Sequence, residues 1–165
     1  MLKFIRAAAC VAALAVGLAG PADAVTATGS LNVTIIITKT CAVGTSIPVD
    51  FGSQGLLTAD VDAVGDLSVT CTNGTTYDVG LNAGGGSGAT ITNRKMTGPA
   101  SATVTYHLYR DLGRTLNWGN TVSTDTLAGT GTGAAQSIPV YGRVASQTTP
   151  GPGTYNDTVT VTVTY

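Results

Sequence analysis

The chain has 165 residues, a formal net charge of −1 and only 10% charged residues, with no glutamate among them. So few basic residues exclude a cationic surface for nucleic acid, and the scarcity of helix-forming residues argues against an α-helical fold. Threonine, valine and glycine dominate instead, which is typical of an all-β secreted protein of one domain.

The first 24 residues predict a signal peptide. Lys3 and Arg6 precede a run of small apolar residues, 7–19, which is too short to span a bilayer. Residues 22–24 (Ala-Asp-Ala) then match the small-x-small pattern of a signal-peptidase site, so we expect cleavage after Ala24 and export from the cytoplasm. An uncleaved membrane anchor is the alternative.

Cleavage would remove Cys10 and leave Cys41 and Cys71. An even number of cysteines in an exported protein predicts one disulfide. A reactive thiol or a metal-binding pair is disfavoured, because neither cysteine has a second Cys or His at metal-ligand spacing.

Alternation of apolar and polar residues predicts a series of short strands, separated by clusters of Gly, Asn, Asp and Pro. The predicted strands are 28–38, 47–51, 66–72, 77–81, 103–109, 115–118, 136–144 and 158–165. Only residues 58–64 show any helical periodicity. Strands at this spacing indicate an antiparallel β-sandwich.

The first and last predicted strands have the most regular alternation. The apolar face of the first strand consists of Leu31, Val33, Ile35 and Ile37. Ile36 is the exception to the alternation, because it is an apolar residue on the polar face. The apolar face of the last strand consists of Val159, Val161, Val163 and Tyr165. Because this strand runs to the final residue of the sequence, we expect either an unpaired edge or a neighbour supplied by another molecule.

Candidate catalytic residues are few. His107, the single histidine, falls on the polar face of its predicted strand, and no nucleophile motif accompanies it, so we expect it to face solvent. The glycine tracts 84–88 and 129–133 predict flexible loops, since neither has the features of a phosphate-binding loop. The sequence therefore predicts no catalytic residue and no cofactor.

Two charged clusters have a structural and a functional interpretation each. Asp60, Asp62 and Asp66 lie around Gly65, and we expect a solvated loop there, because a calcium loop would need ligands that are absent. Residues 110–114 (Arg-Asp-Leu-Gly-Arg) predict a charged turn, with a contact surface for a partner as the alternative.

Several segments, taken in order and spacing, resemble the spore coat protein U domain family, the subunit type of archaic chaperone–usher pili. They are the N-terminal strand that leads to Cys41, then 50–52 (Asp-Phe-Gly), 67–72 (Leu-Ser-Val-Thr-Cys-Thr), 106–111 (Tyr-His-Leu-Tyr-Arg-Asp), 114–115 (Arg-Thr), 118–119 (Trp-Gly), 140–143 (Val-Tyr-Gly-Arg) and 153–162 (Gly-Thr-Tyr-Asn-Asp-Thr-Val-Thr-Val-Thr).

The resemblance implies an incomplete immunoglobulin-like sandwich, residues 39–165, that follows a donor-strand extension, residues 25–38. A periplasmic chaperone would lend the missing strand. At an outer-membrane usher, the extension of the next pilin subunit would replace it, giving an extracellular pilus for adhesion and biofilm formation. The apolar face of the extension (Leu31, Val33, Ile35 and Ile37) would insert into a neighbour, and the strand with Val159, Val161, Val163 and Tyr165 would line the accepting groove.

Two other hypotheses stay open at this point. The N-terminal strand could complete its own sandwich, which would give a stable secreted coat or matrix protein, although the short connection to Cys41 makes this sterically awkward. A secreted enzyme or ligand-binding sandwich is the third class, and one outward histidine without a nucleophile motif argues against it.

Overall fold

The computed structural model describes residues 23–165. The predicted signal peptide lies almost entirely outside the described residues. The chain divides into an N-terminal unit that ends at Ile35 and a second unit, Ile36–Tyr165. In the described part of the chain, no helix has the length and apolarity that a membrane-crossing helix needs.

The N-terminal residues form no strand ladder within the described chain, from residue 23 to Thr40. The side chains of its apolar face are among the most exposed of the protein, at 88% for Leu31, 87% for Val33 and 81% for Ile35. The sequence predicts a strand over 28–38, but a strand is assigned only where a neighbour accepts its backbone hydrogen bonds. This segment therefore has the strand pattern without a strand partner.

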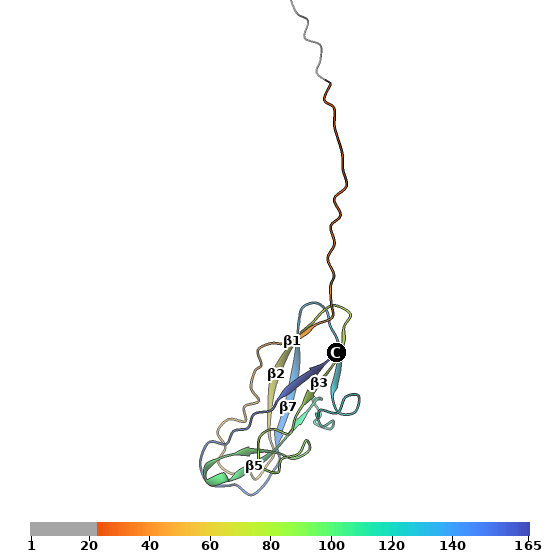
Figure 1. Cartoon of the computed structure of the whole chain (residues 1–165). Coiled ribbons are helices and arrows are strands. Elements are labelled where there is room, and N and C mark those ends of the chain that lie inside the picture. The colour runs from red at the N-terminus through yellow and green to blue at the C-terminus, as the bar shows by residue number, and fades with distance from the viewer. Residues whose placement is uncertain (1–22) are drawn as a thin grey trace, which may run out of the picture. The chain divides into compact units, whose positions relative to one another are not determined.

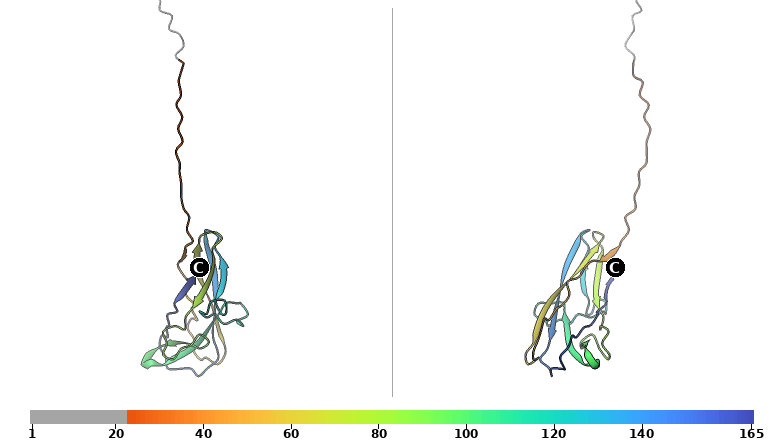
Figure 2. Two further views of the ribbon diagram at one scale, coloured as in Figure 1. Left: turned by 45° about the vertical axis from the view of Figure 1, so that its right-hand side comes forward. Right: turned by 90° about the vertical axis from the view of Figure 1, so that its left-hand side faces the viewer.

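The second unit is an antiparallel β-sandwich, which confirms the predicted fold class. Its larger, five-stranded sheet has the order β1-β2-β7-β5-β4, and its smaller, three-stranded sheet has the order β6-β3-β8 (Figures 1 and 2). The strands are β1 (Cys41–Val43), β2 (Val61–Cys71), β3 (Thr76–Leu81), β4 (Arg94–Thr97), β5 (Thr103–Tyr109), β6 (Leu127–Thr130), β7 (Ala135–Val144) and β8 (Val161–Thr164). A single 3-10 turn, Pro99–Ser101, precedes β5.

The core lies between the two sheets, where the two-residue alternation places the apolar side chains. The buried residues at alternate positions of four predicted strands are Leu67, Val69, Cys71, Tyr77, Val79, Leu81, Val104, Tyr106, Leu108, Ile138, Val140 and Val144. Trp118 is also fully buried, and its indole Nε1 donates a hydrogen bond of 2.8 Å to the Val79 carbonyl. Burial thus follows the apolar–polar alternation from which these four strands were predicted.

Several predicted elements are wrong in kind or extent. Residues 58–64 are not helical, because β2 begins at Val61 and pairs there with Val144 of β7. The predicted strands 47–51 and 115–118 are each reduced to one bridge, Ile47 with Asp66 and Asn117 with Tyr109. The edge strands β4 and β6 were not predicted, because neither has clear alternation.

The predicted disulfide between Cys41 and Cys71 is present. It joins the first residue of β1 to the last residue of β2, at positions that are paired in the ladder. The connection between the N-terminal segment and the sandwich is therefore covalently fixed to the longest strand of the larger sheet.

Candidate functional site

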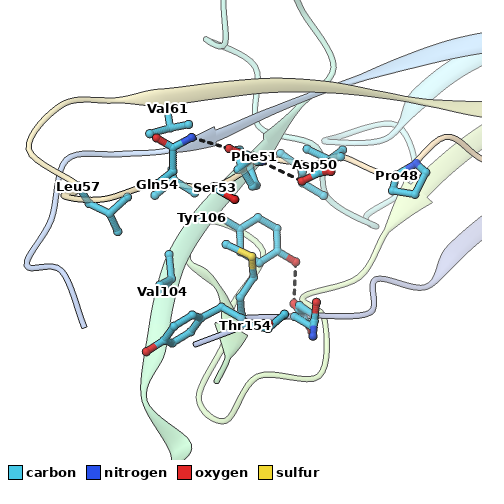
Figure 3. Close-up of a pocket in the computed structure, with 18 of the residues that line it drawn as sticks. Pro48, Asp50, Phe51, Ser53, Gln54, Leu57, Val61, Val104, Tyr106 and Thr154 are labelled. Carbon is cyan, nitrogen blue, oxygen red and sulfur yellow. Dashed lines mark hydrogen bonds between the residues drawn. The ribbon is translucent and has the colours of Figure 1, made fainter. Parts of the chain in front are cut away.

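The sandwich is open along one side. A groove of about 1450 Å³ lies there, bordered by residues 46–57 on one side and by residues 149–159 with Val161 on the other (Figure 3). The floor of the groove is the core itself, and its buried lining residues are Leu67, Leu81, Val104, Tyr106, Leu108, Val140 and Val144. Apolar core side chains thus face a space that no segment of the second unit fills.

The first border, residues 46–57, is irregular and carries exposed apolar side chains. Ile47 is 66% exposed and Leu56 is 73% exposed, while Val49 and Phe51 are half-buried. Gly142 of β7 permits the close approach of this border, because a Cβ there would overlap Val49 Cγ1. Apart from the bridge at Ile47, this stretch has no ladder partner among the described residues.

The second border continues into β8 and keeps the predicted alternation. Its half-buried, inward-facing residues are Tyr155, Asp157, Val159, Val161 and Val163, and the residues between them are exposed. Val159 and Val161 line the groove, Val163 packs on the core beyond it, and Tyr165 is 57% exposed. The structure therefore brings two of the four predicted groove residues, Val159 and Val161, to the groove.

The backbone of β8 has a free edge. Within residues 23–165, β8 pairs with β3 alone, and the Asn82 N–H donates to the Thr160 carbonyl at 3.1 Å. Because bonded pairs alternate in an antiparallel ladder, Thr162 also faces β3, and the N–H and C=O groups of Val161 and Val163 point to the opposite side. These groups are available to a further strand.

One polar pair crosses the groove floor. The Tyr106 hydroxyl donates a hydrogen bond of 2.6 Å to Asp157 Oδ2. The Asp157 carboxylate also accepts from the Gly85 and Thr158 N–H groups, at 2.7 and 2.8 Å. Burial, followed by the hydrogen bond to Asp157, raises the pKa of Tyr106 well above its ordinary value. The carboxylate is therefore satisfied by the protein itself.

Arg94 is a structural residue that the sequence did not reveal. Its side chain is fully buried and donates to the carbonyls of Leu81, Asn82, Ile91 and Trp118, at 2.7 to 3.0 Å. Burial lowers the pKa of this guanidinium. The Asn82 side chain in turn accepts from the Thr160 N–H at 2.8 Å, so Arg94 holds the loop that positions the second border.

Two of the three clustered aspartates lie on a strand, so the expectation of a solvated loop is wrong for Asp62 and Asp66, whereas Asp60 precedes the strand. Asp62 and Asp66 belong to β2, because the antiparallel ladder with β7 extends to Val61. Asp62 accepts two hydrogen bonds from Arg143, at 2.7 and 2.9 Å, and the side-chain hydrogen bond from Arg143 lowers the pKa of Asp62. Within residues 23–165, no three His, Cys, Asp or Glu side chains gather as a metal site would require.

The two remaining candidates from the sequence are His107 and the segment 110–114. His107 is half-buried in β5 on the face opposite the core, with its ring 6.1 Å from that of Tyr109. In the segment 110–114, the Asp111 carboxylate accepts from the Thr115 and Leu116 N–H groups, at 3.0 and 2.7 Å. These bonds close the predicted turn.

An antiparallel sandwich with an apolar groove and a free strand edge defines a class of proteins that bind an added β-strand. The family model of the Spore Coat Protein U domain matches residues 27–162, and the chain belongs to this family. This membership confirms the resemblance inferred from the sequence, and with it the expectation of a structural protein that is not an enzyme.

Two known proteins resemble the chain along most of its length. Protein U of Myxococcus xanthus is 36% identical over 172 residues, which cover 96% of each protein. A chain in the crystal structure of the CsuC–CsuE chaperone–tip adhesion subunit pre-assembly complex, from the archaic chaperone–usher Csu pili of Acinetobacter baumannii, superposes with a TM-score of 0.56. That match has 23% identity and covers 78% of this chain but 40% of the other, so it concerns the fold.

Proposed function

We propose that the protein is an exported structural subunit of a surface fibre, assembled by donor-strand exchange through a chaperone–usher pathway. Residues 25–38, here named the donor segment, insert into the groove of a neighbouring subunit. A periplasmic chaperone occupies the groove before assembly, and an outer-membrane usher is the site of exchange. The fibre then serves adhesion and biofilm formation at the cell surface.

The single observation that carries this proposal is the groove whose floor is the hydrophobic core. An occupant of such a groove is stabilised in proportion to the apolar area that it removes from water. Here the bordering strand β8 also offers unpaired backbone groups. An added strand satisfies both requirements at once, since its backbone extends the sheet and its alternate side chains cover the floor.

The donor segment has the composition that the groove requires. Leu31, Val33, Ile35 and Ile37 recur at every second residue, and Asn32 and Thr34 lie between them. Burial of four such side chains contributes about 6–12 kcal/mol, which is comparable to the stability of a whole domain. A subunit with an empty groove is therefore marginal, and a chaperone protects it until exchange.

The connection between the donor segment and the sandwich favours insertion into another molecule. The Thr38 carbonyl accepts from Thr72 Oγ1 at 3.1 Å, and the Thr72 N–H donates to the Thr40 carbonyl at 2.9 Å. With residues 38–40 held in this way, few residues are left as a linker between the donor segment and the sandwich, which makes insertion into the subunit's own groove sterically awkward.

The test is a deletion of residues 25–38, expressed in the periplasm with a candidate chaperone. We expect a one-to-one complex with the chaperone and no polymer by size-exclusion chromatography or electron microscopy, whereas the unaltered protein forms fibres. The control is Thr34→Ser, which keeps the apolar face and should polymerise normally. Normal fibres from the deletion variant would refute the proposal, and a stable monomer of the unaltered protein would support the self-completed coat or matrix protein instead.

A further inference from the structure

A short linker joins the donor segment to the sandwich. Residues 38–40 (Thr-Lys-Thr), here named the linker, lie between Ile37, the last apolar residue of the donor segment, and Cys41, the first residue of β1. The linker contains neither proline, which would stiffen its backbone, nor glycine, which would loosen it. Its freedom therefore depends on the hydrogen bonds that its peptide groups make.

Thr72 makes three of these hydrogen bonds. Its Oγ1 accepts from the Thr40 N–H at 3.2 Å and donates to the Thr38 carbonyl at 3.1 Å, with the Thr40 carbonyl as a second, longer acceptor at 3.4 Å. The backbone N–H of Thr72 donates to the Thr40 carbonyl at 2.9 Å. One residue thus holds both peptide groups of Thr40 and the carbonyl of Thr38.

The side chain of Thr72 replaces a backbone group that is used elsewhere. Because Cys41 pairs with Cys71, Thr72 is the next residue opposite Thr40, and in a regular ladder the Thr40 N–H would donate to the Thr72 carbonyl. That carbonyl instead accepts from the Thr75 N–H at 3.0 Å, because the chain turns there towards β3. A hydroxyl can take its place, since it both accepts and donates.

The disulfide next to Thr72 strengthens this arrangement. Hydrogen bonds of exposed groups contribute little by themselves, because water competes for the same donors and acceptors. The Cys41–Cys71 bond, however, lies one residue away on both strands and keeps the linker beside Thr72 even when the bonds are broken. Little further conformational entropy is then lost when they form again.

We propose that Thr72 positions the linker and thereby limits the bending between consecutive subunits of the fibre. This inference rests on the proposed function, because it concerns the joint that donor-strand exchange creates. At this joint the donor segment is buried in one subunit, β1 is fixed to β2 in the other, and the linker connects the two covalently. Fewer free dihedral angles in the linker give a stiffer joint.

Direct contacts between consecutive sandwiches are the competing explanation of a stiff joint. In that case, the bonds of Thr72 would not affect the bending of the fibre. In the proposed arrangement, removal of one hydroxyl loosens every joint along the fibre, because each subunit contributes the same linker.

The first test measures the joint in fibres. Thr72→Val removes the hydroxyl and keeps the shape of the side chain, and Thr72→Ser keeps the hydroxyl. Thr70→Val, two residues earlier on the same face, is the matched control, because Thr70 pairs with Ala42 and not with the linker. We expect the persistence length in electron micrographs to fall by about twofold or more for Thr72→Val alone. An unchanged persistence length would overturn the proposal in favour of contacts between sandwiches.

The second test needs no fibre. A nitroxide label on Ile36→Cys, a position that is 82% exposed and lies two residues before the linker, reports linker motion in the unassembled exported protein, which also carries Cys10→Ser. Since one hydrogen bond changes the population of a released state by roughly fivefold, we expect the mobile fraction of the label to rise by about fivefold in Thr72→Val. Thr72→Ser should restore the spectrum of the unaltered protein.

The two tests separate this inference from the proposed function. A merely structural role of Thr72 would lower the urea midpoint and leave the label unchanged, and that result would overturn the inference whether or not fibres form. If the unaltered protein forms no fibres, the proposed function fails, and the label still decides whether Thr72 holds the linker.

Discussion

Tyr106 and Asp157 connect the two sheets across the floor of the groove. Tyr106 belongs to β5 of the larger sheet, Asp157 lies in the segment that leads into β8 of the smaller one, and the hydroxyl donates to the carboxylate at 2.6 Å. Phe51, from the opposite border, contacts the Tyr106 ring edge-on with centroids 6.5 Å apart. This single tyrosine thus contacts both borders and fixes the width of the groove.

Replacement of Tyr106 by phenylalanine should destabilise the subunit by about 1–2 kcal/mol, because it removes a hydrogen bond to a charged group and retains the ring. The measurement is urea unfolding at neutral pH. Tyr155→Phe is the matched control, since the Tyr155 hydroxyl bonds only to the exposed Gly151 carbonyl. A larger loss for the control would contradict the assigned role.

The raised pKa of Tyr106 also predicts a loss of stability in alkaline solution. The folded state favours the neutral phenol, so the unfolded tyrosine ionises first, at about pH 10. The stability that the neutral Tyr106 phenol contributes is complete below about pH 10 and is lost as the pH rises towards the pKa of Tyr106 in the folded state. Unfolding midpoints measured from pH 8 to pH 11 should fall more steeply for the unaltered protein than for Tyr106→Phe. If the midpoints of the two proteins fall equally with pH, the raised pKa of Tyr106 does not contribute to stability.

Substitutions in the donor segment and substitutions in the groove should each block polymerisation, and the two kinds of variant should complement one another. Val33→Asp introduces a charge into the donor segment, and Val159→Asp introduces one into the groove, so neither variant should polymerise. A mixture should yield only dimers, since one intact groove meets one intact donor segment and the chain then ends. Analytical ultracentrifugation measures the product, with Thr34→Asp as the outward-facing control. Long polymers from the mixture would be incompatible with an asymmetric contact.

Loss of the disulfide should cost about 3–4 kcal/mol in the chain-entropy model, given a loop of about 30 residues. Cys41→Ala with Cys71→Ala should therefore lower the denaturation midpoint, and a reducing agent should lower that of the unaltered protein by a similar amount. The same reagent should leave the double variant unchanged. If the midpoint does not depend on the bond, β1 is held by its ladder alone.

Arg94→Lys should destabilise the fold strongly, by roughly 3 kcal/mol or more, because one ammonium group cannot satisfy four buried carbonyls. Hydrogen exchange should show the loss first at Thr160 and its neighbours, which Asn82 connects to Arg94. Lys95→Met, on the adjacent position of β4, is the control and should have little effect. Uniform exchange throughout the sandwich would instead indicate a global role.

The strands that sequence analysis located best are those that cross the middle of a sheet or carry a complete apolar face. In β5 and β7, each alternate residue is buried, so the period-two pattern records the face directly. The four-residue strands β4 and β6 were not predicted, because their sequences, which include Arg94, Lys95 and Gly129, do not alternate between apolar and polar residues. Their place in the sheet depends on partners far away in the sequence.

The sequence by itself predicted the alternation of the strands, the pairing of Cys41 with Cys71, and the resemblance to the Spore Coat Protein U domain family. The tertiary structure decided where the sandwich stays open, since the neighbours of a strand are a property of the whole sheet. It also showed that residues 46–57 form the first border of the groove and that the lining on the second border includes Val159 and Val161 but not Tyr165. Periodicity fixes the face of a strand, whereas its neighbours follow from long-range pairing.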